Sequence, residues 1–160
     1  MEEHVYDQAQ MVNYLGRDFR PAYVPEDLYA QDGAGGWKVV TWKKDGTTVH
    51  ENFSVTYQQN FSDTYQPLRR QVRVEAAKDK LPTQCAVYQA DDARTSTIQG
   101  VPVEVTYTEM EYGPYTKDRQ PAGTYPIYRA AFIYEGIGYI VHGENITQKE
   151  FIDVLCSLFV

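Results

Sequence analysis

Cysteine, positive charge and long apolar runs are all scarce in this chain. No apolar run approaches the roughly 20 residues that a helix needs to span a bilayer, so we expect no membrane-crossing helix. Lys and Arg number 15 against 22 Asp and Glu, and the net charge is -7. Nucleic-acid binding needs clustered basic side chains that neutralise phosphates. The one close cluster is Arg69, Arg70 and Arg73 on an expected strand, so we predict no nucleic-acid partner.

The two cysteines, Cys85 and Cys156, fit neither a metal site nor a redox motif. They form no Cys-x-x-Cys pair, and no second Cys or His lies at metal-ligand spacing. We therefore expect no metal and no cofactor. A Cys85–Cys156 disulfide would close a long loop and stabilise the fold by on the order of a few kcal/mol. The alternative is two free thiols, buried or half-buried.

The length and the apolar content predict one domain. At 160 residues and 42% hydrophobic content, the chain can bury roughly two-thirds of its unfolded surface, which is enough for one core. The expected single domain covers residues 1–160. Its parts are a helical lead-in at 1–16, an extended entry at 17–36, an antiparallel sheet at 37–142 and a C-terminal helix at 147–159.

Alternation of apolar and polar residues predicts the sheet, because successive strand side chains point to opposite faces. The expected strands cover residues 37–43, 48–57, 68–76, 101–107, 125–134 and 137–142. Asp45-Gly46 between the first two is the strongest short hairpin signal, and Glu135-Gly136 separates the last two. Residues 78–99 give no clear pattern, since Pro82 interrupts them, and the polar run Asp91-Asp92-Ala93-Arg94 indicates a solvated loop.

Helices are expected at both ends of the chain. Apolar residues recur at helical spacing from Val5 to Leu15, and Gly16 follows as a C-terminal stop. Thr147 and Glu150 form a capping box at the start of the second helix, whose broad apolar face suits the cover that a half-buried sheet needs. The fold class is therefore α+β: an antiparallel sheet of about five to six strands covered by a C-terminal helix, with a short N-terminal helix.

Reactive groups are few. The three histidines are His4, His50 and His142. Spacing reveals no Ser-His-Asp or Cys-His arrangement, and a structural cysteine explains Cys85 better than a nucleophile does. A Ca²⁺ site joining Asp91-Asp92 to Glu109 and Glu111 lacks an ordered ligand loop, so a solvated charge run is the better reading. We predict that the protein is not an enzyme.

Aromatic residues offer a better route to function. The chain has 14 tyrosines, many of which fall on expected strands. Prolines and glycines keep residues 111–125 out of regular structure, and tyrosines in such a loop suit contact with a protein or a glycan. The candidate binding surface is Tyr112, Tyr115, Tyr125, Phe61 and Tyr65. The alternative is that these rings pack back onto the sheet edge.

Three matches to the N-x-Ser/Thr glycosylation pattern begin at Asn52, Asn60 and Asn145. Such short patterns arise often by chance, and Thr147 of the third match already caps a helix. These matches are therefore weak indications of modification.

Residues 128–158 resemble the close of a bacterial domain of unknown function. That ending is an aromatic strand, an acidic-Gly turn, a Tyr-bearing strand and a helix with a Ser before its last apolar residues. The positions that fit are Gly136, Tyr139, Thr147, Glu150, Phe151 and Ser157. Residues 15–28 are similar to the proline-containing entry of the same family. A more distant resemblance is to photosystem-subunit-P-like domains, and neither resemblance carries catalytic residues.

The family is common in Gram-positive lipoproteins and membrane-tethered extracytoplasmic proteins. The resemblance implies an extracytoplasmic location, with membrane attachment only through a tether absent from this chain. It also implies a non-catalytic interaction or sensory domain that binds a protein partner. The alternative is a small-ligand or glycan-binding module that uses the aromatic loops or the open sheet face. A concave aromatic cavity would favour the ligand-binding alternative, and a flat apolar patch of roughly several hundred Å² would favour the protein partner.

Overall fold

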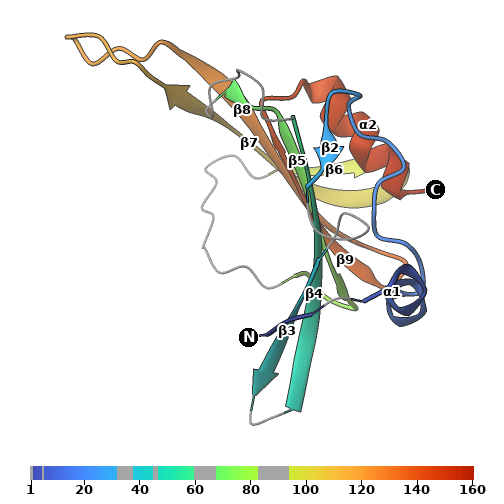
Figure 1. Ribbon diagram of the computed structural model, residues 1–160. Helices are drawn as coiled ribbons and strands as arrows, with labels where there is room; N and C mark the ends of the chain where they lie inside the picture. Colours follow the sequence, from blue (N-terminus) through green and yellow to red (C-terminus); the bar gives the residue numbers. More distant parts are fainter. Residues whose placement is uncertain (1, 5, 32–37, 45–46, 60–67, 83–93) are drawn as a thin grey trace.

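The computed structural model describes residues 2–4, 6–31, 38–44, 47–59, 68–82 and 94–160. Within these ranges the helices are α1 (Gln8–Leu15) and α2 (Gln148–Leu158), and the strands are β1 (Glu2–His4), β2 (Tyr29–Ala30), β3 (Lys38–Lys44), β4 (Thr47–Gln58), β5 (Gln71–Lys78), β6 (Arg94–Ile98), β7 (Val101–Tyr112), β8 (Gly123–Tyr134) and β9 (Ile137–Glu144). The strands form one antiparallel sheet in the order β1-β3-β4-β5-β9-β8-β7-β6, and β2 pairs with β4 outside this path. Both helices lie on one face of the sheet (Figure 1).

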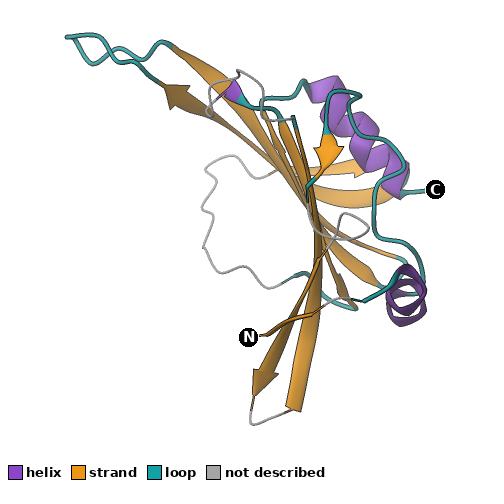
Figure 2. Cartoon of the chain, viewed as in Figure 1, coloured by secondary structure: helices purple, strands orange, loops and turns teal. Residues whose placement is uncertain are grey.

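The α+β class is confirmed, but the predicted number of strands is too small. All six predicted strands are present, as β3, β4, β5, β7, β8 and β9. The described sheet has nine strands, of which seven are at least five residues long (Figure 2). The extra strands are held by pairing with neighbours and carry little apolar alternation of their own, so their sequences did not reveal them.

Strand β6 begins at Arg94, the last residue of the run 91–94 that was expected to be a solvated loop, and it continues through residues 95–98, where the sequence gives no clear signal. It runs Arg-Thr-Ser-Thr-Ile, and every residue but Ile98 is exposed, because β6 is the last strand of the sheet. It pairs along its full length with β7, from Arg94↔Val105 to Ile98↔Val101. The predicted helical lead-in at residues 1–16 is wrong at its start, because Glu2 to His4 form strand β1 and pair with β3. Strand β2 falls in the expected extended entry.

Residues close in sequence determine the caps of α1 and the turn between β8 and β9. Helix α1 begins at Gln8, later than predicted, because the side chain of Asp7 caps the helix in a capping box with Gln10. It ends at Gly16, which has the left-handed φ of 96° expected of a glycine stop. The predicted turn between β8 and β9 is confirmed, with φ of 48° at Glu135 and 77° at Gly136. The Asp45-Gly46 turn lies outside the described residues.

The core lies between the helices and one face of the sheet. Helix α2 has the predicted capping box: the amide of Glu150 donates to Thr147 Oγ1 at 3.1 Å, and the amide of Thr147 donates to Glu150 Oε1 at 2.9 Å. Its apolar face is buried in one cluster with side chains of α1 and the central strands. The largest fully buried side chains are Tyr139, Phe19, Phe53, Phe151, Met11, Ile137, Ile146, Leu155 and Leu158. Neither helix of the described chain is long and apolar enough to cross a membrane.

Candidate ligand-binding site

A groove of about 510 Å³ lies between α2 and the strands β6, β7 and β8. Its lining residues are Arg94, Ser96, Val105, Tyr107, Tyr128, Gln148, Phe151 and Ile152. Strand register explains why they meet: Arg94 pairs with Val105 and Tyr107 pairs with Tyr128, so alternate side chains of three strands face the helix side. The groove therefore forms where α2 leaves this end of the sheet partly uncovered. We call it the aromatic groove.

Three rings contact one another in succession along the aromatic groove, the first pair tilted and the second stacked. The ring centroids of Tyr107 and Tyr128 are 5.1 Å apart with an interplanar angle of 48°. Those of Tyr128 and Phe151 are 5.2 Å apart at 22°. Phe151 is buried, Tyr128 is half-buried, and Tyr107 is 41% exposed. The three rings, which we call the aromatic ladder, therefore extend from the core to the surface, and the Tyr107 ring is accessible to solvent.

The polar groups of the groove are neutral hydroxyls and amides, together with one cation. The Tyr107 hydroxyl donates to Glu109 Oε1 at 2.7 Å. This hydrogen bond, together with burial, raises the pKa of Tyr107 to about 12. Burial, and then the charge of Glu109, raises the pKa of Tyr128. Both phenols therefore stay protonated near neutral pH. Strand β6 adds the Arg94 guanidinium and the Ser96 hydroxyl, and α2 adds the Gln148 amide; all three residues are exposed.

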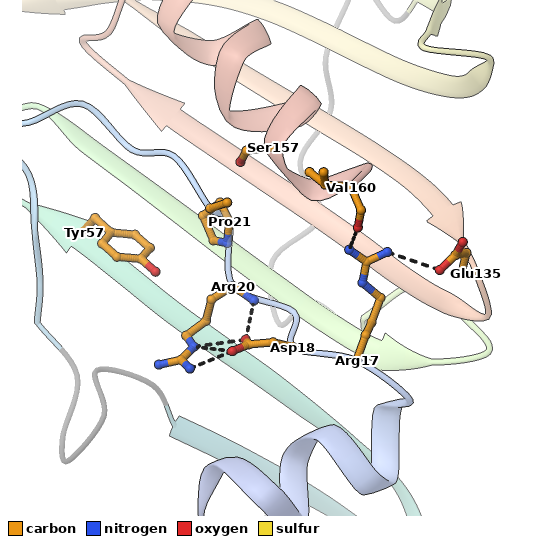
Figure 3. Close-up of a pocket in the computed structure, with 9 residues that line it drawn as sticks. Arg17, Asp18, Arg20, Pro21, Tyr57, Glu135, Ser157 and Val160 are labelled. Carbon is orange, nitrogen blue, oxygen red and sulfur yellow. Dashed lines mark hydrogen bonds and ion pairs between the residues drawn. The ribbon is translucent and has the colours of Figure 1, made fainter.

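A second groove, of about 710 Å³, lies beside the C-terminal end of α2 (Figure 3). Its charges are already paired. Arg17 donates to Glu135 at 3.2 Å and to the carbonyl oxygen of Val160 at 2.6 Å, while Arg20 pairs with Asp18 at 2.6 Å. Burial alone would raise the pKa of Asp18, but the hydrogen bonds from Arg20 lower it. Arg17 thus links its segment to Val160 and to the β8–β9 turn, and the Arg20–Asp18 pair lies within the segment, which indicates a structural role.

The predicted tyrosine surface lies mainly on the hairpin of β7 and β8. Residues 109–125 form the β7–β8 arm, which projects away from the body of the domain (Figure 1). Tyr112 and Tyr125 lie on the face away from the helices, with ring centroids 6.4 Å apart. Tyr115, beyond the end of β7, is 56% exposed. Phe61 and Tyr65 lie outside the described residues.

The tyrosines of the arm partly pack on the arm itself. A Cβ added to Gly123 would lie 2.6 Å from the Tyr112 hydroxyl oxygen, so the Tyr112 ring covers that glycine. Tyr115 similarly folds back over Gly113, where an added Cβ would lie 3.3 Å from its ring. The arm therefore presents Tyr115 and Met110, the latter 45% exposed, as its exposed apolar side chains among the described residues. No ring of the arm lines the aromatic groove.

A row of polar side chains crosses the sheet on the face away from the helices. Arg73, His142 and Arg129 are direct neighbours on β5, β9 and β8. Burial, followed by the charges of both arginines, lowers the pKa of His142 to about 4. Arg73 Nε lies 3.1 Å from Glu75 Oε1, and burial raises the pKa of Glu75. Sequence reasoning missed this row because only strand register brings the three side chains together.

Several expectations about reactive groups concern residues outside the described ranges. Cys85 and Asp91-Asp92 lie there, so the disulfide, nucleophile and Ca²⁺ alternatives are not described by the structure. Cys156 is a half-buried free thiol. Within the described residues, no group of three or more His, Cys, Asp or Glu side chains could hold a metal ion.

Two of the three glycosylation matches fall on asparagines that the fold uses. Asn52 is buried, and the Asn145 side chain donates to the carbonyl oxygen of Leu68 at 2.6 Å. Asn60 lies outside the described residues. The folded chain therefore does not present Asn52 or Asn145 for modification.

Comparisons of the chain with protein-family models, curated proteins and solved structures found no match. The resemblance of residues 128–158 to an extracytoplasmic domain family therefore stays a prediction. The evidence on function is therefore the geometry of the aromatic groove, the β7–β8 arm and the polar row.

Proposed function

We propose that this protein is a non-catalytic binding domain whose ligand lies in the aromatic groove. The observation that carries the proposal is the aromatic ladder of Tyr107, Tyr128 and Phe151 inside the aromatic groove of about 510 Å³. Small-molecule sites are concave, mostly apolar and roughly 300–1,000 Å³ in volume, with a few polar groups that fix orientation. Of the two functions expected from the sequence, the groove supports the small-ligand or glycan-binding module.

The chemistry of the lining suits a ring that has one apolar face and a polar edge. Such a ring can lie on the exposed face of Tyr107, where close packing supplies dispersion contacts. The Ser96 hydroxyl and the Gln148 amide lie on opposite walls and can each donate and accept hydrogen bonds. A sugar ring has this combination of a C–H face and a hydroxyl edge. We therefore take a glycan as the ligand.

A titration of the labelled protein with neutral oligosaccharides tests this function. Soluble oligomers of glucose, galactose and N-acetylglucosamine serve as probes, and backbone amide shifts report the contact. We expect at least one probe to shift the amides of Ser96, Gln148 and Phe151. Tyr107→Ala removes the exposed ring and is expected to weaken that binding about five- to tenfold, as loss of one aromatic contact would.

Tyr115→Ala is the matched control, because it removes an exposed tyrosine ring from the β7–β8 arm instead of the groove. It should leave oligosaccharide binding unchanged. Shifts confined to the arm, or equal losses in Tyr107→Ala and Tyr115→Ala, would contradict a ligand in the aromatic groove.

A protein partner is the second candidate function, and the β7–β8 arm favours it. The arm projects from the body of the domain (Figure 1) and exposes Met110 and Tyr115. Tyrosine and methionine side chains are both enriched at protein interfaces. If the arm binds a partner, capture of one defined protein should be lost in Tyr115→Ala and retained in Tyr107→Ala. The extracytoplasmic location remains a prediction that depends on the sequence resemblance alone.

A further inference from the structure

We propose that the ligand of the aromatic groove is an acidic saccharide, whose uronic-acid carboxylate binds the Arg94 guanidinium. This inference depends on the proposed glycan-binding function and specifies the substrate class of the same groove. It follows from charge complementarity at the wall that β6 contributes.

Among the described residues, Arg94 is the only cation that lines the groove. Arg94 is exposed, and within this part of the chain its side chain makes no ion pair or hydrogen bond. Other arginines do find acidic partners: Arg17 with Glu135, Arg20 with Asp18, Arg70 with Glu150 and Arg73 with Glu75. No acidic side chain of the described residues pairs with this guanidinium, which is therefore available to a ligand in the groove.

The geometry of guanidinium selects a carboxylate over a neutral group. Its planar fork of N–H donors matches the two oxygens of a carboxylate, and charge-assisted hydrogen bonds of this kind are about twice as strong as neutral ones. Ser96 lies two residues along the same strand face, since Arg94 pairs with Val105 and Ser96 pairs with Val103. A carboxylate at Arg94 and a ring hydroxyl at Ser96 can thus be bound by one strand.

Charges at the two ends of the groove give the ligand one orientation. Glu109, which accepts the Tyr107 hydroxyl, lies four residues beyond Val105 on β7, or about 13 Å along an extended strand. Glu104 pairs with Thr95, and strand alternation turns it away from the groove. An anionic ligand should therefore place its carboxylate toward β6, and its neutral hydroxyls toward Tyr107 and Glu109.

The test compares two saccharides of equal length, trigalacturonate and the neutral galactose trisaccharide, by calorimetry at low and at moderate salt. We expect wild type to bind trigalacturonate about tenfold more tightly, a preference that falls as salt screens the charge pair. Arg94→Gln should abolish the preference, so that the two trisaccharides bind with equal affinity. Arg94→Lys should retain part of the preference for trigalacturonate. Arg119→Gln, which removes an exposed arginine from the β7–β8 arm, should change neither affinity.

The outcomes separate this inference from the proposed function. Tyr107-dependent binding of both saccharides with equal affinity would overturn the acidic preference and leave glycan binding standing. A preference for trigalacturonate that survives Arg94→Gln would also overturn the role of Arg94. If neither saccharide binds and the shift experiment with the other neutral oligomers is also silent, both proposals fail together.

Discussion

The neutral His142 imidazole should make the fold less stable as pH falls from 7 to 5. The imidazole lies between Arg73 and Arg129 in direct register on adjacent strands. Burial and the two guanidinium charges lower its pKa from 6.5 to about 4. In the unfolded chain its pKa returns to about 6.5. The folded state therefore binds fewer protons than the unfolded state between these two values, and stability falls as pH falls through this window.

The magnitude follows from linkage. A shift of one pKa unit corresponds to about 1.4 kcal/mol, so the full depression of the His142 pKa is worth about 3 kcal/mol below pH 4. About 2 kcal/mol of this should already be lost between pH 7 and pH 5. The pKa values of Glu75 and Glu144 are raised by burial, so these carboxyls stabilise the fold as pH falls and oppose His142. The wild-type change is therefore smaller than the contribution of His142 itself.

Comparison with His142→Gln isolates that contribution, because the variant keeps both carboxyls and cannot titrate at position 142. Urea unfolding followed by circular dichroism at pH 7 and pH 5 gives the free energy of unfolding of each protein. We expect wild type to lose about 2 kcal/mol more than His142→Gln over this interval. Equal losses in the two proteins would refute the placement of a neutral imidazole between two arginines. So would a His142 ring that titrates near its ordinary pKa by NMR in the folded protein.

Three further predictions concern the fold. Leu155→Ala should lower the free energy of unfolding by about 2–5 kcal/mol, since Leu155 is fully buried on the face of α2 that packs on the sheet. Unchanged urea melts would contradict the observed packing. Thr147→Ala should cost about 1 kcal/mol by leaving the Glu150 amide uncapped, whereas Thr147→Ser should retain the cap. Gly138→Ala should cost about 3 kcal/mol or more, because the new Cβ would lie 1.9 Å from the Lys80 carbonyl oxygen. A Gly138→Ala midpoint in urea close to that of wild type would show that the two segments separate easily.

Strong local signals explain which parts of the fold the sequence could predict. Helix α2 was found at Thr147 and Glu150 because a capping box is complete within four residues. The β8–β9 hairpin was found because Gly136 tolerates the left-handed backbone that a tight turn needs. Strand β6 was missed because an exposed edge strand needs no apolar alternation, and Arg-Thr-Ser-Thr-Ile has almost none.

The candidate site was harder to predict because it depends on register between distant segments. Tyr107 and Tyr128 looked like ordinary strand residues in the sequence, and nothing local tied them to Phe151 on α2. Their stacking requires the Tyr107↔Tyr128 pair and the docking of α2 over β8. Prolines and glycines predicted a loop over residues 111–125, but Tyr112 and Tyr125 lie on β7 and β8, and only Tyr115 lies in the loop between them. Loop signals thus point to exposed rings, whereas a concave site appears only when strand register is known.

The aromatic groove follows from a mismatch between the width of the sheet and the size of its cover. Eight strands in hydrogen-bonded order span about 34 Å, because neighbouring strands lie about 4.8 Å apart. A helix with its side chains is about 10–12 Å wide, so α1 and α2 together cannot cover the whole face. At the β6 end the uncovered positions are filled by stacked rings and by Arg94 and Ser96 instead of by a third helix. The large side chain of Tyr107 remains 41% exposed there, and its burial on one side by Tyr128 holds it in place for a ligand.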